Sequence, residues 1–161
     1  LTENPEFSEL FMGLIGFCES FVIIGTFWPS IILLLVAVAL NEIGISVLNI
    51  CLFAGIGSFL GDVLSYYLGI SFGPKIKSLN FVKKRENKIL KAEDFIKRYG
   101  WGAIVIGRFI PAIRPFIPFI TGISFMPQKI FLISAFISCI LWAISLALIL
   151  IGIDSIITLF N

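Results

Sequence analysis

The chain has 161 residues, of which 58% are hydrophobic and 14% are charged, and it contains no histidine. Soluble domains carry about 25% charged residues, so this composition excludes a disordered chain, a fibre, a disulfide scaffold and an ordinary soluble enzyme. The absence of histidine removes the commonest metal ligand and general base. We therefore expect a single membrane domain over residues 1–161 with no metal site, in which any chemistry depends on carboxylates, arginines or backbone groups.

Four apolar runs of about 30 residues each follow one another along the chain. One membrane-spanning helix needs about 20 residues, so each run is too long for one simple span and too short for two. The second and fourth runs lack internal proline, and we predict membrane-spanning helices over 45–72 and 130–158. The first and third runs are interrupted by glycine and proline, which end helices. We predict re-entrant hairpins there, over 10–40 and 99–125, with breaks marked by Gly25, Pro29, Gly107, Pro111, Pro115, Pro118 and Gly122.

The two breaks share the pattern Gly-x-Phe-x-Pro, which begins at Gly25 and again at Gly107. When the sequence is shifted by the offset between these two motifs, the second apolar run also aligns with the fourth. The chain therefore resembles two copies of a hairpin followed by a span, over 10–74 and 99–161. Each copy crosses the membrane once, so the second copy is inverted relative to the first. Inverted repeats with broken helices are typical of secondary transporters, whose sites lie where the breaks meet. We accordingly predict an all-α membrane fold with an inverted-topology repeat.

Between the two copies lies a segment over 75–98 with nine lysines and arginines. The positive-inside rule places it in the cytoplasm, with the N-terminus, the turn at Asn41-Glu42 and the C-terminus on the other side. Residues 82–99 carry an apolar stripe at helical spacing, which favours a basic amphipathic helix on the anionic leaflet. A plain solvated loop is the alternative.

Four charged residues lie inside the apolar runs: Glu19, Asp62, Arg108 and Arg114. An unpaired charge at the bilayer centre costs about 2.5–3.5 kcal/mol on insertion scales, so we expect the two acids and two arginines to pair in a protein-lined cavity. Guanidinium groups hold phosphate bidentately, and the acids would neutralise the arginines or carry a coupling proton. Fixed structural ion pairs are the alternative interpretation.

Other residues in the runs carry weaker signals. The small residues of the second run indicate close helix packing, and the aromatics of the spans indicate packing or membrane-interface positions. The cysteines are widely spaced, which indicates small buried apolar side chains. The small residues are Gly55, Gly57, Ser58 and Gly61, the aromatics are Tyr66, Tyr67, Trp101 and Trp142, and the cysteines are Cys18, Cys51 and Cys139.

Three stretches resemble the DedA family of membrane proteins, which carry the SNARE-associated or VTT domain. They are Phe17-Cys18-Glu19, residues 61–69 (Gly-Asp-Val-Leu-Ser-Tyr-Tyr-Leu-Gly), and above all residues 107–115 (Gly-Arg-Phe-Ile-Pro-Ala-Ile-Arg-Pro). The resemblance implies two opposed re-entrant hairpins and transport of polyprenyl phosphate or phospholipid, coupled in some bacterial members to protons or sodium.

Carried over by residue, the resemblance makes Glu19 the family's first membrane acid and Arg108 and Arg114 its two arginines, while Asp62 falls in a Gly-Asp-x-x-x-Tyr pattern. One feature departs from the family: Pro29 is followed by Ser30 and Ile31, where many members have glycine and an acid. This departure fits an uncoupled scramblase, or a protein in which Asp62 supplies the titratable group.

We therefore predict a lipid translocase, a flippase or scramblase, in a bacterial inner membrane. Its substrate would be a lipid with an anionic phosphate headgroup, such as undecaprenyl phosphate or a phospholipid. The partners implied are this lipid, the bilayer and further copies of the chain, with no nucleic acid, and no cofactor beyond a coupling H⁺ or Na⁺. The alternatives are a proton-coupled small-solute transporter or channel and a non-transport membrane scaffold. An enzyme is not expected, because no nucleophile–base pair is visible.

Overall fold

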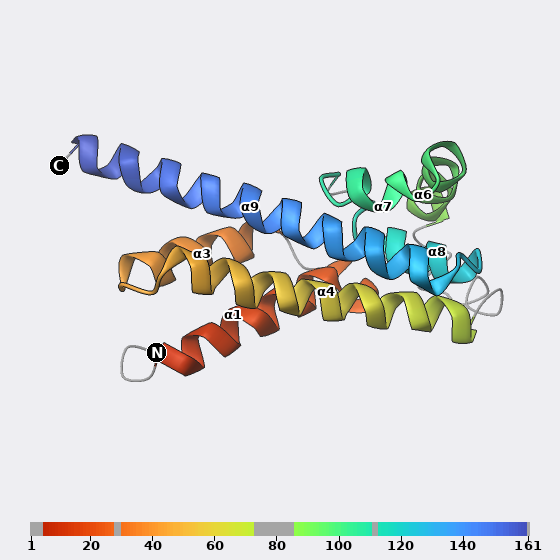
Figure 1. Ribbon diagram of the computed structural model, residues 1–161, viewed down its shortest axis with the longest axis horizontal. Helices are drawn as coiled ribbons and strands as arrows, with labels where there is room; N and C mark the ends of the chain where they lie inside the picture. Colours follow the sequence, from red (N-terminus) through yellow and green to blue (C-terminus); the bar gives the residue numbers. More distant parts are fainter. Residues whose placement is uncertain (1–4, 28–29, 73–85, 111–112, 161) are drawn as a thin grey trace.

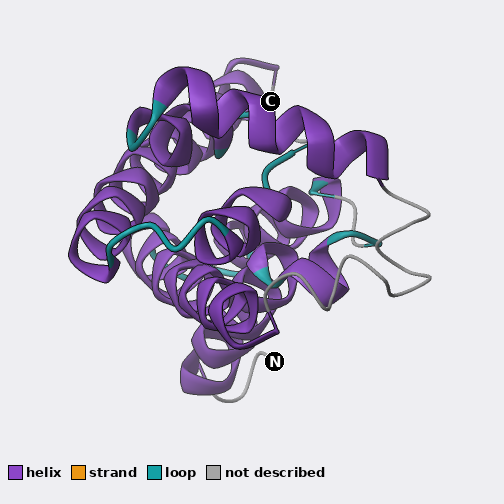
Figure 2. Cartoon of the chain, turned by 90° about the vertical axis from the view of Figure 1, so that its right-hand side faces the viewer, coloured by secondary structure: helices purple, strands orange, loops and turns teal. Residues whose placement is uncertain are grey.

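The computed structural model describes residues 5–27, 30–72, 86–110 and 113–160, and within these ranges all regular secondary structure is helical (Figure 1). Seen from one end, the described chain consists of helices joined by short loops (Figure 2). Pro29, Pro111 and the first part of the basic segment lie outside the described residues. The helices are α1 (Pro5–Ser20), α2 (Val22–Gly25), α3 (Ile31–Glu42), α4 (Val47–Phe72), α6 (Glu86–Tyr99), α7 (Gly102–Gly107), α8 (Phe116–Ile123) and α9 (Gln128–Phe160).

The two longest helices, α4 and α9, match the predicted spans closely. Within the described chain, Val47–Phe72 and Gln128–Ile153 are long and apolar enough to cross a membrane. Large apolar side chains such as Leu52 and Leu60 on α4 and Ile133 and Leu148 on α9 are exposed. Faces of this kind are stable in lipid rather than in water.

The first broken run starts and ends at one end of α4. Helix α1 leads from the N-terminal end to the middle of the bundle, and α3 leads back toward that end (Figure 1). Helix α1 ends where Phe21 adopts an extended backbone, with φ −74° and ψ 123°. The freed N–H of Val22 donates to Ser65 Oγ at 2.9 Å. The break therefore begins ahead of Gly25, earlier than predicted, because a side chain of α4 replaces the lost helical acceptor.

The second broken run, α7 and α8, lies at the opposite end of α4 (Figure 1). Helix α7 ends at Gly107 and α8 begins after Pro115, so these two residues lie at the facing ends of the two helices. Pro118 and Gly122 lie within α8, so the prediction that they interrupt a helix is wrong. Pro118 occupies the first turn of α8, where a backbone N–H has no helical acceptor to lose. Gly122 instead allows close packing, since an added Cβ would overlap the carbonyl oxygen of Tyr66 on α4.

Helix α6 covers most of the predicted amphipathic segment, and residues 82–85 lie outside the described residues. It packs against α7 and α8. Ile96 is buried in the same apolar cluster as Phe116 and Ile117 of α8, and Phe95 packs against that cluster. The apolar face that we expected on the membrane surface is therefore partly buried within the protein.

Helix α4 approaches α1 closely through glycines, as its small residues predicted. A Cβ added to Gly57 would overlap the carbonyl oxygen of Gly13 on α1, and one added to Gly61 would lie 2.8 Å from the carbonyl oxygen of Phe17. Gly55 differs, because its added Cβ would meet only the Cβ of Ala143, at an ordinary 3.7 Å. Gly57 and Gly61 thus bring the end of α1 against the middle of α4.

These contacts predict different effects for two alanine substitutions on the same helix. Gly57→Ala forces α1 away from α4 and should lower the free energy of unfolding by about 1–3 kcal/mol, the usual cost of overpacking. Gly55→Ala is the matched control and should stay close to the wild-type value. Unfolding in detergent micelles measures both; equal stability of the two variants would contradict the packing described for Gly57.

Candidate functional site

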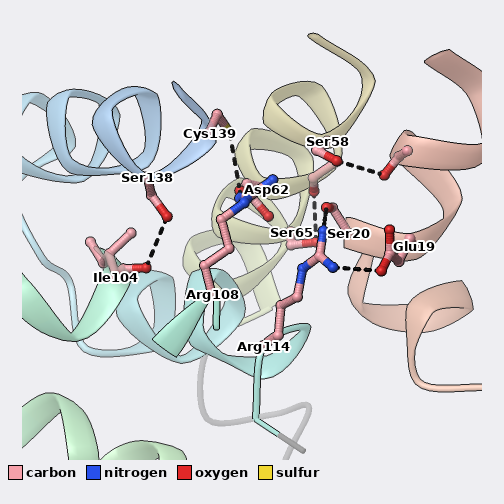
Figure 3. Close-up of polar contacts among 12 residues, drawn as sticks. Glu19, Ser20, Ser58, Asp62, Ser65, Ile104, Arg108, Arg114, Ser138 and Cys139 are labelled. Carbon is pink, nitrogen blue, oxygen red and sulfur yellow. Dashed lines mark hydrogen bonds and ion pairs between the residues drawn. The ribbon is translucent and has the colours of Figure 1, made fainter. Parts of the chain in front are cut away.

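The four predicted charged residues come together where the two broken runs meet the middle of α4 (Figure 3). Glu19 lies at the end of α1, Asp62 on α4, Arg108 directly after α7 and Arg114 two residues before α8 begins. Each residue is at most 7% exposed. The breaks thus bring charges from distant parts of the chain into one buried cluster, which we call the charge cluster.

Two ion pairs join the halves of the chain. Arg108 Nη1 donates to Asp62 Oδ2, and Arg114 Nη1 donates to Glu19 Oε1. Arg114 Nη2 also donates to Ser20 Oγ at 3.4 Å. The two acids and two arginines neutralise one another, as the charge count predicted, and each pair connects an element before the basic segment with one after it.

The ion pairs leave hydrogen-bonding capacity unused. Among the described residues, Arg108 Nε, Arg108 Nη2, Arg114 Nε and Glu19 Oε2 are buried without a hydrogen-bond partner. Buried polar atoms are rarely left in this state, because each costs about 1–3 kcal/mol. Arg108 Nε and Nη2 form one edge of the planar guanidinium, an edge that suits the paired oxygens of a phosphate or carboxylate.

A cavity of about 230 Å³ adjoins the charge cluster. One water needs about 10–15 Å³ of such volume, so the cavity admits a larger group. Its wall combines three members of the charge cluster with apolar residues of α3 and α9, and two wall residues, Phe109 and Ile149, are about half exposed. The third exposed wall residue is Ser30, so the cavity is charged inside and mainly apolar toward the surface, an arrangement that suits an amphiphile. Its lining is Glu19, Ser30, Leu33, Leu34, Arg108, Phe109, Arg114, Trp142, Ser145, Leu146 and Ile149.

Two residues of helix α9 make contacts with the charge cluster that the sequence did not reveal. The guanidinium carbons of Arg114 and Arg108 lie over the ring of Trp142, at 4.9 Å and 5.6 Å from its centroid. Cys139, one turn earlier, is buried as predicted, and its thiol lies 3.9 Å from Asp62 Oδ2. The signal available was the helical spacing of Cys139, Trp142 and Ser145, which places polar or aromatic side chains on one face of an apolar span.

The ion pairs predict non-additive effects on stability. Asp62→Asn leaves the Arg108 charge buried without a counter-charge and should lower the free energy of unfolding by about 3–5 kcal/mol. Asp62→Leu combined with Arg108→Met removes both charges and should recover most of that loss. Unfolding of the single and double variants in detergent tests this coupling, and a double variant less stable than Asp62→Asn would contradict it.

Comparison with known proteins places this site in a family. The model of the VTT domain matches residues 28–152, a range that includes Asp62, Arg108, Arg114 and Trp142 and begins after Glu19. No solved structure matches the chain.

Three relatives illustrate the likeness. An uncharacterized membrane protein of Buchnera aphidicola (subsp. Acyrthosiphon pisum) is 32% identical over 143 residues, which cover 88% of this chain and 56% of the relative. The inner membrane protein YabI of Escherichia coli K12 is 29% identical over 143 residues, with the same coverage. Protein DedA of Escherichia coli K12 is 32% identical over 135 residues, 81% of this chain and 62% of the relative. The chain spans little more than half the length of these relatives, and with its apolar helices and its match to the VTT domain it belongs to the DedA family of integral membrane proteins.

Proposed function

We propose that this protein moves a lipid with an anionic phosphate headgroup across a bacterial inner membrane, as a flippase or scramblase. The observation that carries the proposal is the pair of buried arginines with unused donors beside a cavity that is mainly apolar toward the surface. The headgroup would enter the cavity and contact Arg108 and Arg114. The lipid tail would remain in the hydrocarbon around α3 and α9.

The proposal includes a membrane topology. The first broken run, α1 to α3, and the second, α7 to α8, would be re-entrant hairpins that enter from opposite sides, while α4 and α9 cross. Their positions at opposite ends of α4 support this inverted arrangement (Figure 1). Irregular backbone at membrane depth is tolerated where it is buried in protein or lines a wet cavity, and the charge cluster lies at both breaks.

Headgroup binding would exchange one set of charge-assisted hydrogen bonds for another. A phosphate oxygen replaces a carboxylate oxygen on Arg108 or Arg114, and the unused Arg108 Nε and Nη2 supply further donors. Each arginine therefore keeps an anionic partner throughout, whereas the displaced carboxylate loses its cationic partner.

The same exchange offers a route to ion coupling. When a phosphate takes over Arg108, Asp62 loses its counter-charge, and uptake of a proton or a sodium ion by its carboxylate would compensate. Ser30 and Ile31 follow Pro29, where the family resemblance predicts glycine and an acid. Asp62 and Glu19 are therefore the carboxylates of the charge cluster that could bind the coupling ion. A scramblase would instead exchange the headgroup without ion uptake.

Reconstitution tests the proposal. Proteoliposomes should move a phosphate-bearing lipid between leaflets, and Arg108→Gln or Arg114→Gln should slow this at least about tenfold, since a hydrogen bond to a charged group contributes about 1.5–3 kcal/mol. Arg98→Gln, at an exposed arginine of α6, is the control and should retain the wild-type rate.

The outcomes separate the proposal from its alternatives. Wild-type lipid movement in both arginine variants, at equal protein level and fold, would overturn the headgroup role. Release of a trapped small solute without lipid movement would indicate a solute transporter or channel. A non-transport scaffold predicts movement of neither lipid nor solute, and it predicts that removing one whole ion pair, as in Glu19→Gln with Arg114→Gln, leaves function intact.

A further inference from the structure

We infer that Trp142 is a positioning residue of the charge cluster, which holds Arg108 and Arg114 side by side for one anion. The identity of that anion as a lipid phosphate rests on the proposed function, whereas the positioning role rests on geometry. Both guanidinium carbons lie over its ring, at 4.9 Å and 5.6 Å from the centroid. Attraction between a cation and an aromatic face is strongest where water is excluded, and both arginines are almost completely buried.

Each hydrogen-bonded ion pair holds one arginine only. Glu19, the partner of Arg114, lies on α1, whereas Asp62, the partner of Arg108, lies on α4. Each acid also lies close enough to attract the second arginine, and these attractions offset the repulsion between the two like charges. Trp142 adds one aromatic face that both guanidinium groups share, and this contact is uncharged and independent of the acids.

The Trp142 ring is supported by apolar side chains. Trp142 packs against an apolar cluster that includes Leu33 of α3 and Leu146 and Leu150 of α9. Its position on the uninterrupted helix α9, between Cys139 beside Asp62 and Ser145 on the cavity wall, directs it to the charge cluster. The ring thus forms part of the cavity wall and is supported by an apolar cluster.

This arrangement suits anion exchange. When a phosphate displaces the carboxylates, the arginines lose the bonds that held them, but the contacts with Trp142 remain. An aromatic ring attracts the cations without competing as an acceptor for their N–H groups. Trp142 would therefore keep the two guanidinium groups in position while their hydrogen-bond acceptors change from the carboxylates to the anion.

Two substitutions distinguish this role from simple packing. Leucine retains an apolar side chain at position 142 but has no aromatic face, whereas phenylalanine retains both properties. We expect Trp142→Leu to raise the lipid concentration for half-maximal transport about tenfold, and Trp142→Phe to change it less than about threefold, in line with the energy of one desolvated cation–π contact. Trp101→Phe, at an exposed tryptophan, is the control. Equal values for the leucine and phenylalanine variants would overturn the inference, even if transport itself is confirmed.

A binding measurement makes the test independent of transport. The chain has three tryptophans, so Trp28→Phe with Trp101→Phe leaves Trp142 as the only one. In detergent, a short-chain phosphatidic acid should change its fluorescence saturably, and a short-chain diacylglycerol, which lacks phosphate, should not.

The response should disappear when Arg108→Gln and Arg114→Gln are added. Inorganic phosphate in the same assay separates the sources of the anion: a response to it alone would support the role of Trp142 while contradicting a lipid substrate. An unchanged signal with both phosphate probes, or an equal response to diacylglycerol, would overturn the inference.

Discussion

Pairing of charges in an apolar environment is the constraint on which the rest of this structure depends. A lone charge at the bilayer centre costs about 2.5–3.5 kcal/mol on insertion scales, and this chain buries two acids and two arginines. Each arginine finds one acid, and each pair joins elements far apart in the sequence. The close α1–α4 contact through Gly57 and the position of α9 behind the arginines bring these partners together.

The broken helices follow from the same constraint. Arg108 and Arg114 lie between α7 and α8, and Glu19 lies just ahead of the extended residue Phe21. Such breaks free backbone groups that must find partners inside the protein, and Ser65 supplies one for Val22. The side chains at the breaks can therefore converge on α4. Two straight helices would keep these side chains apart.

Much of the fold could be predicted because the bilayer imposes simple rules. Run length and proline position identified the two spans and the break between Gly107 and Pro115. The four charges stood out because the runs around them are apolar. Which acid pairs with which arginine was not predictable, since two acids and two arginines allow either arrangement.

The remaining differences have local physical causes. The break at Phe21 depends on an acceptor that lies on another helix, so no local pattern reveals it. Pro118 and Gly122 resemble helix breakers until the start of α8 is known. Trp142 looked like an ordinary aromatic of a membrane span, because its role comes from contacts with residues of another run.

The central claim is that the charge cluster binds an anionic phosphate headgroup, and native mass spectrometry of the purified protein tests it most directly. The wild-type protein, released gently from detergent, should retain a phosphate-bearing lipid. The Arg108→Gln, Arg114→Gln double variant should lose that lipid, while Arg98→Gln keeps it. Retention of the same lipid by the double variant, or a wild-type protein that carries no phosphate-bearing lipid, would contradict the claim.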